Sequence, residues 1–398
     1  MKIVQINTVC GSGSTGKICL AVSRLLTLKG IENYILYASG NSDYPEGIRY
    51  MTPMEVKRQA LCSRLLGNYG FNSASATKRL LKELDRIKPD VVHLHNLHGH
   101  NVHLEMLFSY LRERKVKVFW TFHDCWAFTG YCPHYDMIGC QSWKTGCGKC
   151  PQKKHYSWIL DRSRALYERK KGIFKDVDLT VITPSEWLAQ QVGQSFLKDV
   201  PVKVIRNGID LSVFYPREND FRVKYGLENK YIVLGVAFGW GVRKGLDVFI
   251  ELSKRLDERY KIVLVGTNDE IDAQLPENII SIHRTQDQAE LAEIYTAADV
   301  FVNPTREENY PTTHMESLAC GTPVITFATG GSMEMLDDTC GCVVPKNDVD
   351  RLEKKIVEIC VTKPFSSEDC INKSKSFSAE DKFEEYVAIY ENKNSFSD

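Results

Sequence analysis

Short apolar runs rich in Val and Ile recur through the first half of the chain, with helical stretches between them. The runs that we expect to be strands cover residues 2–8, 33–39, 91–95, 116–124, 179–185 and 202–207. They are apolar throughout rather than alternating, which is typical of parallel strands that helices cover on both faces. The first half of the chain is therefore predicted to form a doubly wound α/β domain.

The same pattern begins again after Pro216 and predicts a second α/β domain. Its expected strands cover residues 231–237, 260–266, 279–283, 300–305, 323–329 and 341–345. Near the end of the chain, one helical face carries Phe383, Tyr386, Val387 and Tyr390. Such a face needs an apolar surface to lie on.

We therefore predict three parts in this chain. They are a Rossmann-like domain over residues 1–212 with a Cys-rich loop at 125–155, a second Rossmann-like domain over 213–375, and a C-terminal helix in 376–398 that packs back toward the first domain. Ligands of such folds usually bind at the carboxyl ends of the parallel strands. We expect the functional site in a cleft where the two sheets meet.

Charge and composition narrow the class of protein. The 398 residues contain 51 Lys and Arg and 51 Asp and Glu, so the long-range field that draws a protein onto nucleic acid is missing. An apolar content of 43% allows real hydrophobic cores. No apolar run approaches the roughly 18 residues of a membrane span, and the N-terminus lacks a signal-peptide pattern, so we expect a cytoplasmic globular protein.

A Gly-rich loop follows the first expected strand, at residues 11–17. Gly13 and Gly16 would let backbone amides approach a phosphate or a sugar at a helix start. The loop fits the dinucleotide and P-loop fingerprints only in part, since Ile18 stands where a P-loop has Ser or Thr. We predict a ligand-facing loop; a P-loop or dinucleotide-binding enzyme, and a tight turn without ligand, are the alternatives.

Two carboxylates flank a helix start after the expected strand 300–305. We predict that Thr313 and Glu316 form a capping box. Glu308 and Glu316 could instead hold the hydroxyls of a sugar and a ribose, while the first amides of the helix face a phosphate.

A basic pair, Arg243 and Lys244, follows the first strand of the second domain and a Gly-rich turn. The Arg fork and the Lys charge suit a diphosphate, whose negative charge as a leaving group must be neutralised. The alternative is a solvated helix start.

Together these motifs resemble glycosyltransferase family 4. The resemblance rests on Glu-x7-Glu before Ala-Cys-Gly-Thr-Pro-Val-Ile, on Arg-Lys-Gly after a strand, on the Gly-rich first loop, on Pro-Ser-Glu at 184–186 and on Val-Ile-Arg-Asn-Gly-Ile-Asp at 204–210. It implies the GT-B fold and transfer of a sugar, with retention of configuration, from a nucleotide-diphosphate sugar to a glycan or a lipid-linked saccharide in cell-surface polysaccharide synthesis. No cofactor and no protein nucleophile are then required for the chemistry.

The resemblance also implies roles for single residues. Glu308 would hold hydroxyls of the donor sugar, and His123 matches the histidine that reaches this sugar near the reacting centre. The further residues implied in donor binding are Gly13, Gly16, Arg243, Lys244, Asn309, Tyr310, Thr312, Thr313 and Glu316. The chain departs from the family where Asn309-Tyr310-Pro311 replaces Gly-Phe-Gly and where Gly239 replaces an Arg.

Four cysteines lie close together in the loop that leaves the strand of His123. A closed structural zinc site is predicted from four thiols, Cys132, Cys140, Cys147 and Cys150, of which the last two form a C-x-x-C motif. Unpaired thiols, a disulfide pair or an iron–sulfur cluster are the alternatives. With zinc, a non-catalytic glycan-binding protein is a further possible class. The histidines at 93–100 are interpreted as hydrogen-bonding groups rather than metal ligands.

Basic residues crowd positions 162–175, with apolar residues between them. A solvated helix face is one interpretation, and contact with the anionic inner face of a membrane is the other. A lipid-linked acceptor would favour the second.

Overall fold

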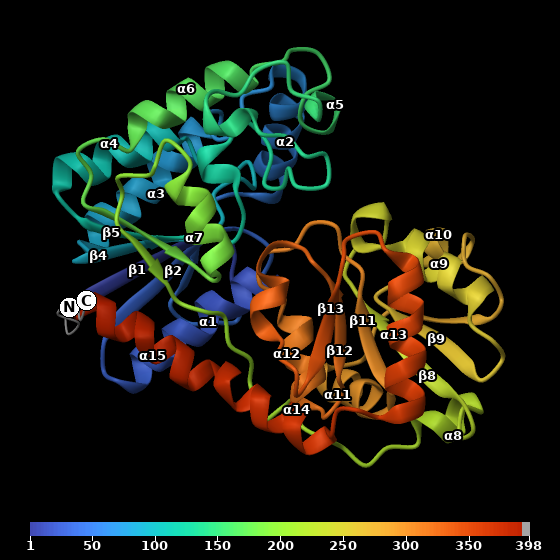
Figure 1. Ribbon diagram of the computed structural model, residues 1–398. Helices are drawn as coiled ribbons and strands as arrows, with labels where there is room; N and C mark the ends of the chain where they lie inside the picture. The colour runs from blue at the N-terminus through green and yellow to red at the C-terminus, as the bar shows by residue number, and fades with distance from the viewer. Residues whose placement is uncertain (392–398) are drawn as a thin grey trace. The chain divides into compact units, whose positions relative to one another are not determined.

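The computed structural model describes residues 1–391, in two compact units (Figure 1). Residues 1–206 and 383–391 form the first unit, and residues 207–382 form the second. The expected boundaries were 212 and 375. The second unit extends beyond both of these boundaries because Ile209 is bonded to residues 377–379. Its N–H donates to the Phe377 carbonyl at 2.9 Å, and its carbonyl accepts from the Ala379 amide at 2.9 Å.

The first unit is built on one parallel sheet of seven strands in the order β3-β2-β1-β4-β5-β6-β7. The strands are β1 (Lys2–Val9), β2 (Glu32–Ser39), β3 (Gly47–Arg49), β4 (Val91–Leu94), β5 (Lys117–Thr121), β6 (Leu179–Thr183) and β7 (Val202–Val204). Six of them are the predicted runs. The short edge strand β3 was not predicted, because its three residues carry no apolar run.

The second unit holds a parallel sheet of six strands in the order β10-β9-β8-β11-β12-β13. The strands are β8 (Tyr231–Val236), β9 (Tyr260–Val265), β10 (Ile279–Ile282), β11 (Val300–Asn303), β12 (Val324–Phe327) and β13 (Gly341–Val344). All six predicted runs are present. Two Rossmann-like sheets confirm the predicted fold class.

Helices cover both faces of each sheet (Figure 1). In the first unit they are α1 (Gly13–Leu28), α2 (Pro53–Leu66), α3 (Ala74–Ile87), α4 (Leu104–Arg114), α5 (Lys153–Tyr156), α6 (Ser163–Ile173) and α7 (Glu186–Gly193). In the second they are α8 (Phe221–Tyr225), α9 (Leu246–Arg255), α10 (Asp269–Asp272), α11 (Gln288–Ala297), α12 (Thr312–Ala319), α13 (Val349–Thr362) and α14 (Ser367–Ser374). Short 3-10 turns are η1 (Trp126–Phe128), η2 (Ser142–Lys144), η3 (Val242–Lys244), η4 (Gly330–Met335) and η5 (Lys375–Phe377).

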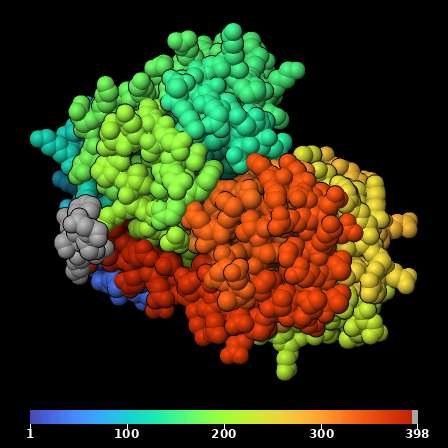
Figure 2. All heavy atoms as spheres, viewed as in Figure 1, coloured from blue at the N-terminus to red at the C-terminus, as the bar shows by residue number. Residues whose placement is uncertain are grey.

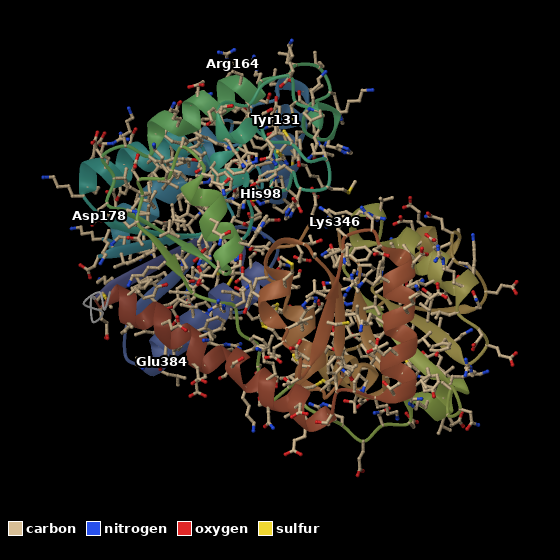
Figure 3. All side chains as sticks on the ribbon, in the orientation of Figure 1. His98, Tyr131, Arg164, Asp178, Lys346 and Glu384 are labelled. Carbon is tan, nitrogen blue, oxygen red and sulfur yellow. The ribbon has the colours of Figure 1, made fainter. Side chains whose placement is uncertain are left out.

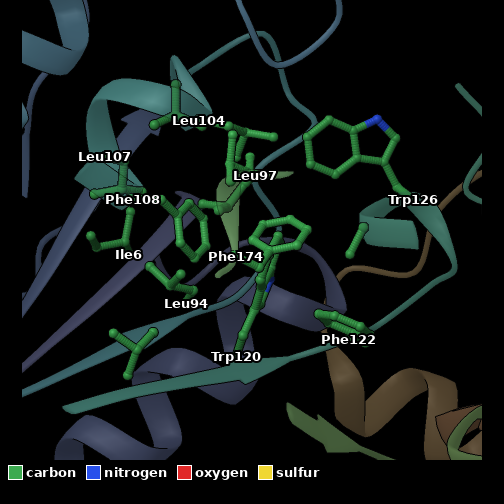
Figure 4. Close-up of a cluster of buried hydrophobic side chains, with 14 of the residues drawn as sticks. Ile6, Leu94, Leu97, Leu104, Leu107, Phe108, Trp120, Phe122, Trp126 and Phe174 are labelled. Atoms are coloured by element: carbon green, nitrogen blue, oxygen red, sulfur yellow. The ribbon is translucent and has the colours of Figure 1, made fainter. Parts of the chain in front are cut away.

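Burial of alternate residues on opposite faces explains why the strands read as continuous apolar runs. In β8, Ile232 and Leu234 belong to one core of the second unit, and Val233 between them belongs to the other. In the first unit, Phe108 of α4 packs against Trp120 and Phe174 at ring distances of 5.5 and 4.8 Å (Figure 4). Each sheet is therefore rigid enough to fix the loops at its carboxyl edge.

The C-terminal helix α15 (Ala379–Tyr390) begins in the second unit and ends in the first. The predicted apolar face is buried, and Tyr390 bonds through its hydroxyl to Nδ1 of His93 on β4 at 2.5 Å. Glu384, labelled in Figure 3, forms an ion pair with Lys29 at 2.8 Å. The end of the predicted segment, residues 392–398, lies outside the described residues.

Candidate active site

The order of the strands selects one loop pair in the second unit. The chain leaves β8 for one neighbour and returns on the other side as β11, so the loops after β8 and β11 open at the switch point of the sheet. The loop after β8 ends in η3, which carries Arg243 and Lys244. The loop after β11 carries Glu308.

A glycine lets these two loops touch. Gly245 has φ +76°, and a Cβ there would lie 2.5 Å from the Pro304 carbonyl oxygen, so no other residue fits without a shift. The contact continues through Arg243, whose carbonyl accepts from the Arg306 amide at 2.9 Å and from the Thr305 hydroxyl at 3.2 Å. The backbone of η3 is thereby fixed against the segment that follows β11.

The contact brings Lys244 and Glu308 together. Lys244 Nζ lies 2.6 Å from Glu308 Oε2, and each side chain is 18% exposed. The sequence assigned them separately, one to a diphosphate and one to sugar hydroxyls. Their adjacency means that a single ligand with an anionic group next to a hydroxyl-bearing ring can meet both.

The loop of Glu308 is held on two sides. A Cβ at Gly330 (φ +54°) would lie 1.8 Å from the Glu308 carbonyl oxygen, so η4 packs directly on this backbone. The Asn207 side-chain amide donates to the Tyr310 carbonyl at 3.3 Å. Asn309 and Tyr310 are buried, and the Asn309 amide donates to Glu308 Oε1 at 3.2 Å. The departures from Gly-Phe-Gly therefore produce a packed loop.

The predicted capping box of Thr313 and Glu316 is wrong. Helix α12 starts two residues earlier than expected, at Thr312 with Pro311 as N-cap, and no side chain caps it. The fixed φ of proline suits this position, and Thr313 is already inside the first turn. Glu316 is left for another contact, since its Oε2 accepts from the Tyr295 hydroxyl at 3.2 Å. The first-turn amides of α12 can favour an anion.

Two residues of this site, His314 and Arg306, were not predicted from the sequence. His314 is fully buried in α12, its Nε2 lies 2.9 Å from Asn303 Nδ2, and burial lowers its pKa to about 3. Arg306 pairs with Asp247 at 2.8 Å and reaches Asn347 at 2.7 Å. The local sequence does not predict these contacts, because Asn303 lies 11 residues before His314 and Asp247 lies 59 residues before Arg306.

The Gly-rich loop of the first unit is shorter than predicted, because α1 begins at Gly13. The Gly11 amide donates to the Gly16 carbonyl at 3.1 Å, and a Cβ on Gly16 would lie 3.0 Å from Val9. Gly13 and Lys17 are exposed. The loop thus closes on itself as a tight turn, which does not favour the P-loop alternative.

Histidines gather after β4 and β5 of the first unit. His123 Nε2 lies 3.1 Å from His95 Nδ1, with the rings stacked at 5.4 Å. Burial lowers the pKa of His123 to about 4. Beside them, burial opposes ionisation of His98, but Asp124 at 2.8 Å raises its pKa (Figure 3 labels His98).

A small pocket of the first unit is lined by His95, His98, His123, Asp124 and Trp126. Within residues 1–391, the one group of three potential metal ligands with atoms inside 4.8 Å of one another is elsewhere, at Asp269, Asp272 and His283. The histidines do make hydrogen bonds, His95 to Gln5 and to His123, and His98 to Asp124.

The four cysteines lie in one loop and are all unpaired. Burial, and then the other three sulfurs, raise the pKa of Cys132 to about 12, and the Gly130 amide donates to Cys147 Sγ at 3.3 Å. Cys140 and Cys150 pack at the edge of the same core. The sulfurs are neighbours, but in the described chain no three of them meet within 4.8 Å, so zinc stays a prediction.

The loop has a core of its own. Trp143 is 1% exposed and stacks on Tyr135 at 4.9 Å. Lys170 of α6 is fully buried, donates to the carbonyls of Trp126 and Thr129 at 2.7 and 3.0 Å, and has a pKa lowered by burial to about 7. Aromatic packing and one buried lysine therefore order much of a loop for which the sequence suggested a metal.

None of the helices in residues 1–391 is long and apolar enough to cross a bilayer.

Comparison with protein families gives two matches that together cover most of the chain. Residues 16–213 match the family described as Glycosyltransferase Family 4, and residues 229–361 match the one described as Glycosyl transferases group 1. The first falls on the unit with the histidines and the second on the unit with Lys244 and Glu308.

Individual proteins agree with these matches. The chain is 24% identical to the putative colanic acid biosynthesis glycosyl transferase WcaC of Escherichia coli K12, over 98% of this chain and all of that protein. Among solved structures, sucrose-phosphate synthase from Thermosynechococcus elongatus has a TM-score of 0.73 at 17% identity, with 98% of both chains covered. Anabaena HepE in complex with UDP-glucose has a TM-score of 0.69 at 13% identity, covering 98% of this chain and 100% of that one. These structures share the GT-B fold with this chain.

Proposed function

Since this chain is a glycosyltransferase that belongs to glycosyltransferase family 4, we propose that it transfers a hexosyl or N-acetylhexosaminyl group from a nucleotide-diphosphate sugar with retention of configuration. The acceptor is a glycan or a lipid-linked saccharide of cell-surface polysaccharide synthesis. The relative WcaC is described as a putative colanic acid biosynthesis glycosyl transferase. The observation that carries the proposal is the pairing of Lys244 with Glu308 at the switch point of the second sheet.

The donor binds in the second unit. The Lys244 ammonium, with Arg243, neutralises the diphosphate, and Glu308 accepts hydrogen bonds from the hydroxyls of the sugar. Glu316 holds the ribose, next to the Tyr295 hydroxyl that already bonds to it at 3.2 Å. The first amides of α12, at Thr312 and Thr313, add partial positive charge at the phosphate.

The same contacts assist the reaction. The bond from the anomeric carbon to the diphosphate breaks as the acceptor oxygen attacks from the same face, and donor phosphate oxygens help to take the acceptor proton. Negative charge grows on the leaving group, so a fixed cation stabilises the transition state more than the ground state. His123 contacts the sugar near the reacting carbon, and Gly13 and Gly16, at the start of α1, let backbone amides approach the donor.

For the acceptor, we propose contact between the first unit and an anionic membrane. Three neighbouring apolar side chains, Trp158, Ile159 and Leu160, are 58, 62 and 43% exposed and follow the basic pair at 153–154. The Trp158 amide donates to the Arg64 carbonyl at 2.8 Å, which joins this segment to the end of α2. Exposed apolar groups next to lysines are typical of interfacial membrane contact. Figure 2 shows in green the surface of the part of the first unit to which this segment belongs.

The basic stretch at 162–175 offers fewer free cations for contact with a membrane than the sequence suggested. Lys170 is buried, and Arg169 pairs with Glu105 at 2.7 Å and covers the Phe71 ring at 3.9 Å. These two cations are therefore engaged in contacts within the first unit. Arg164, labelled in Figure 3, is exposed.

Flotation with anionic liposomes tests the membrane proposal. We expect the wild-type chain to float with the vesicles and Trp158→Ser/Ile159→Ser to float at least about fivefold less, because membrane affinity scales with the apolar area inserted. Leu28→Ser is the matched control, since Leu28 is 85% exposed in the same unit but outside this segment. Wild-type protein that stays at the bottom of the gradient contradicts membrane contact.

For the cysteine loop, we propose one structural zinc ion bound by Cys132, Cys140, Cys147 and Cys150. Thiolates so close together repel one another, and a cation removes that penalty. Metal analysis is expected to find one zinc per chain. Cys150→Ser should lose the zinc, and its free energy of unfolding should fall by about 3 kcal/mol. Cys62→Ser, which lies outside the loop, should keep the zinc and the wild-type stability. A metal-free wild type that melts together with Cys150→Ser contradicts zinc.

Turnover decides between the enzyme and a non-catalytic glycan-binding protein. We expect released nucleoside diphosphate for at least one sugar nucleotide when lipid-linked saccharide extracts are added. A screen for thermal stabilisation identifies the donor first, because a ligand of the folded state raises stability by mass action. Binding without release, even with acceptor extracts, supports the non-catalytic alternative.

A further inference from the structure

A chain of hydrogen bonds in the first unit links a buried glutamine to His123. Its members are Gln5 of β1, His95 after β4 and His123 after β5. Gln5 and His95 are 0 and 1% exposed, so water does not compete for the bond between them, and His123 is half-buried. The direction of each bond can be worked out atom by atom.

The orientation of the Gln5 amide is fixed by α1. One terminal atom of Gln5 lies 2.9 Å from the Cys19 carbonyl oxygen and 2.8 Å from the Ser23 hydroxyl. A carbonyl oxygen only accepts, so the atom facing it must be the NH₂ nitrogen. The amide oxygen Oε1 therefore faces His95 Nε2, at 3.0 Å.

This orientation fixes the tautomer of His95. An amide oxygen also only accepts, so Nε2 of His95 carries a hydrogen. Burial, and then the neighbouring His93 and His123, lower the pKa of His95 well below its usual value, so the ring is neutral and carries no second N–H. Nδ1 of His95 is consequently an acceptor.

We propose that Gln5 and His95 are positioning residues that set the tautomer of His123, so that His123 carries its proton on Nε2 and its lone pair on Nδ1. The His123 Nε2–H donates to His95 Nδ1 at 3.1 Å. In this tautomer Nδ1 of His123 can accept a hydrogen bond from a hydroxyl but cannot donate one. The functional part rests on the proposed role of His123; the tautomer itself does not.

The neighbouring His93 does not supply this control. Its ring lies 4.0 Å from that of His95, but its nitrogens bond to Tyr390 and Thr121, the latter at 2.8 Å. His93 thus ties the end of α15 to the sheet and supports the ring of His95 from the side. Gln5, and not His93, therefore orients the hydrogen bond that His95 shares with His123.

Nitrogen-15 NMR of the histidine rings in the full chain at pH 7 tests the tautomer, with His123 assigned by its loss in His123→Gln. We expect the Nε2-protonated form in the wild type and a shift toward the Nδ1-protonated form in Gln5→Met, because His95 can then turn its N–H toward His123. Ser23→Ala is the control, since the Cys19 carbonyl still orients the Gln5 amide. A wild-type His123 that is protonated on Nδ1, or charged, overturns the proposal.

Kinetics give the second readout. Gln5→Met is expected to lower kcat about 10- to 100-fold with the donor KM within about twofold, since the ring stays in place but presents the wrong nitrogen. His95→Asn, whose amide oxygen can replace Nδ1, should retain more activity than His95→Leu; equal loss in the two contradicts the proposal. If Gln5→Met does not fold, the wild-type spectrum alone decides. If His123→Ala keeps full turnover, the catalytic role of His123 is contradicted, and the NMR spectrum of the wild type alone tests the tautomer.

Discussion

Lys244→Ala is expected to lower kcat by about three orders of magnitude, because the departing diphosphate loses the fixed charge that balances it in the transition state. Lys244 is held 2.6 Å from Glu308 in a partly buried site, so its position costs little to reorganise during the reaction. The rate of nucleoside diphosphate release is the measurement. The exposed Lys254 on α9 provides the control variant Lys254→Ala, which should match the wild type.

The partner of Lys244 provides a check on the same site. Glu308→Gln keeps the size of the side chain but removes its charge, and we expect a similar loss of turnover. Glu251→Gln, at an exposed ion pair with Arg255, is the control. Because either change removes this ion pair, each variant is first compared with the wild type by thermal melting and circular dichroism. Folded variants with near wild-type rates contradict the assigned roles.

His123→Ala is expected to lower kcat about 10²- to 10³-fold, the usual effect of losing one hydrogen bond that strengthens in the transition state. Since burial lowers the pKa of His123 to about 4, the ring is neutral from pH 6 to 8, and its contribution should be constant over that range. Initial rates at saturating donor measure this. The exposed His155 supplies the control His155→Ala, and a His123→Ala enzyme as active as that control contradicts a role at the reacting centre.

The fold could be predicted from the sequence because strands buried on both faces have a direct signal. Ile232, Val233 and Leu234 are consecutive apolar residues that face two different cores. The edge strand β3 has no such signal, since its three residues are partly or fully exposed. The start of α12 was misplaced by two residues because Pro311 can itself precede the first turn, and a Thr-x-x-Glu spacing does not exclude that.

The candidate site was predicted residue by residue but not as a set of contacts. Nothing in the local sequence says that Gly245 lets η3 touch Pro304, and this contact is what pairs Lys244 with Glu308. The same applies to Gln5, an unremarkable polar residue in the first strand whose partners on α1 and after β4 are set by the sheet order. Long-range partners of this kind are decided by topology, which periodicity and motifs do not specify.

The claim that an anionic leaving group is bound at Lys244 is tested most directly by binding of the nucleoside diphosphate product, measured by calorimetry on the wild type and on Lys244→Ala. Loss of one charge-assisted contact corresponds to a rise in Kd of about 10- to 100-fold. We predict a rise of that size in a variant that melts as a folded protein. An unchanged Kd would contradict the account.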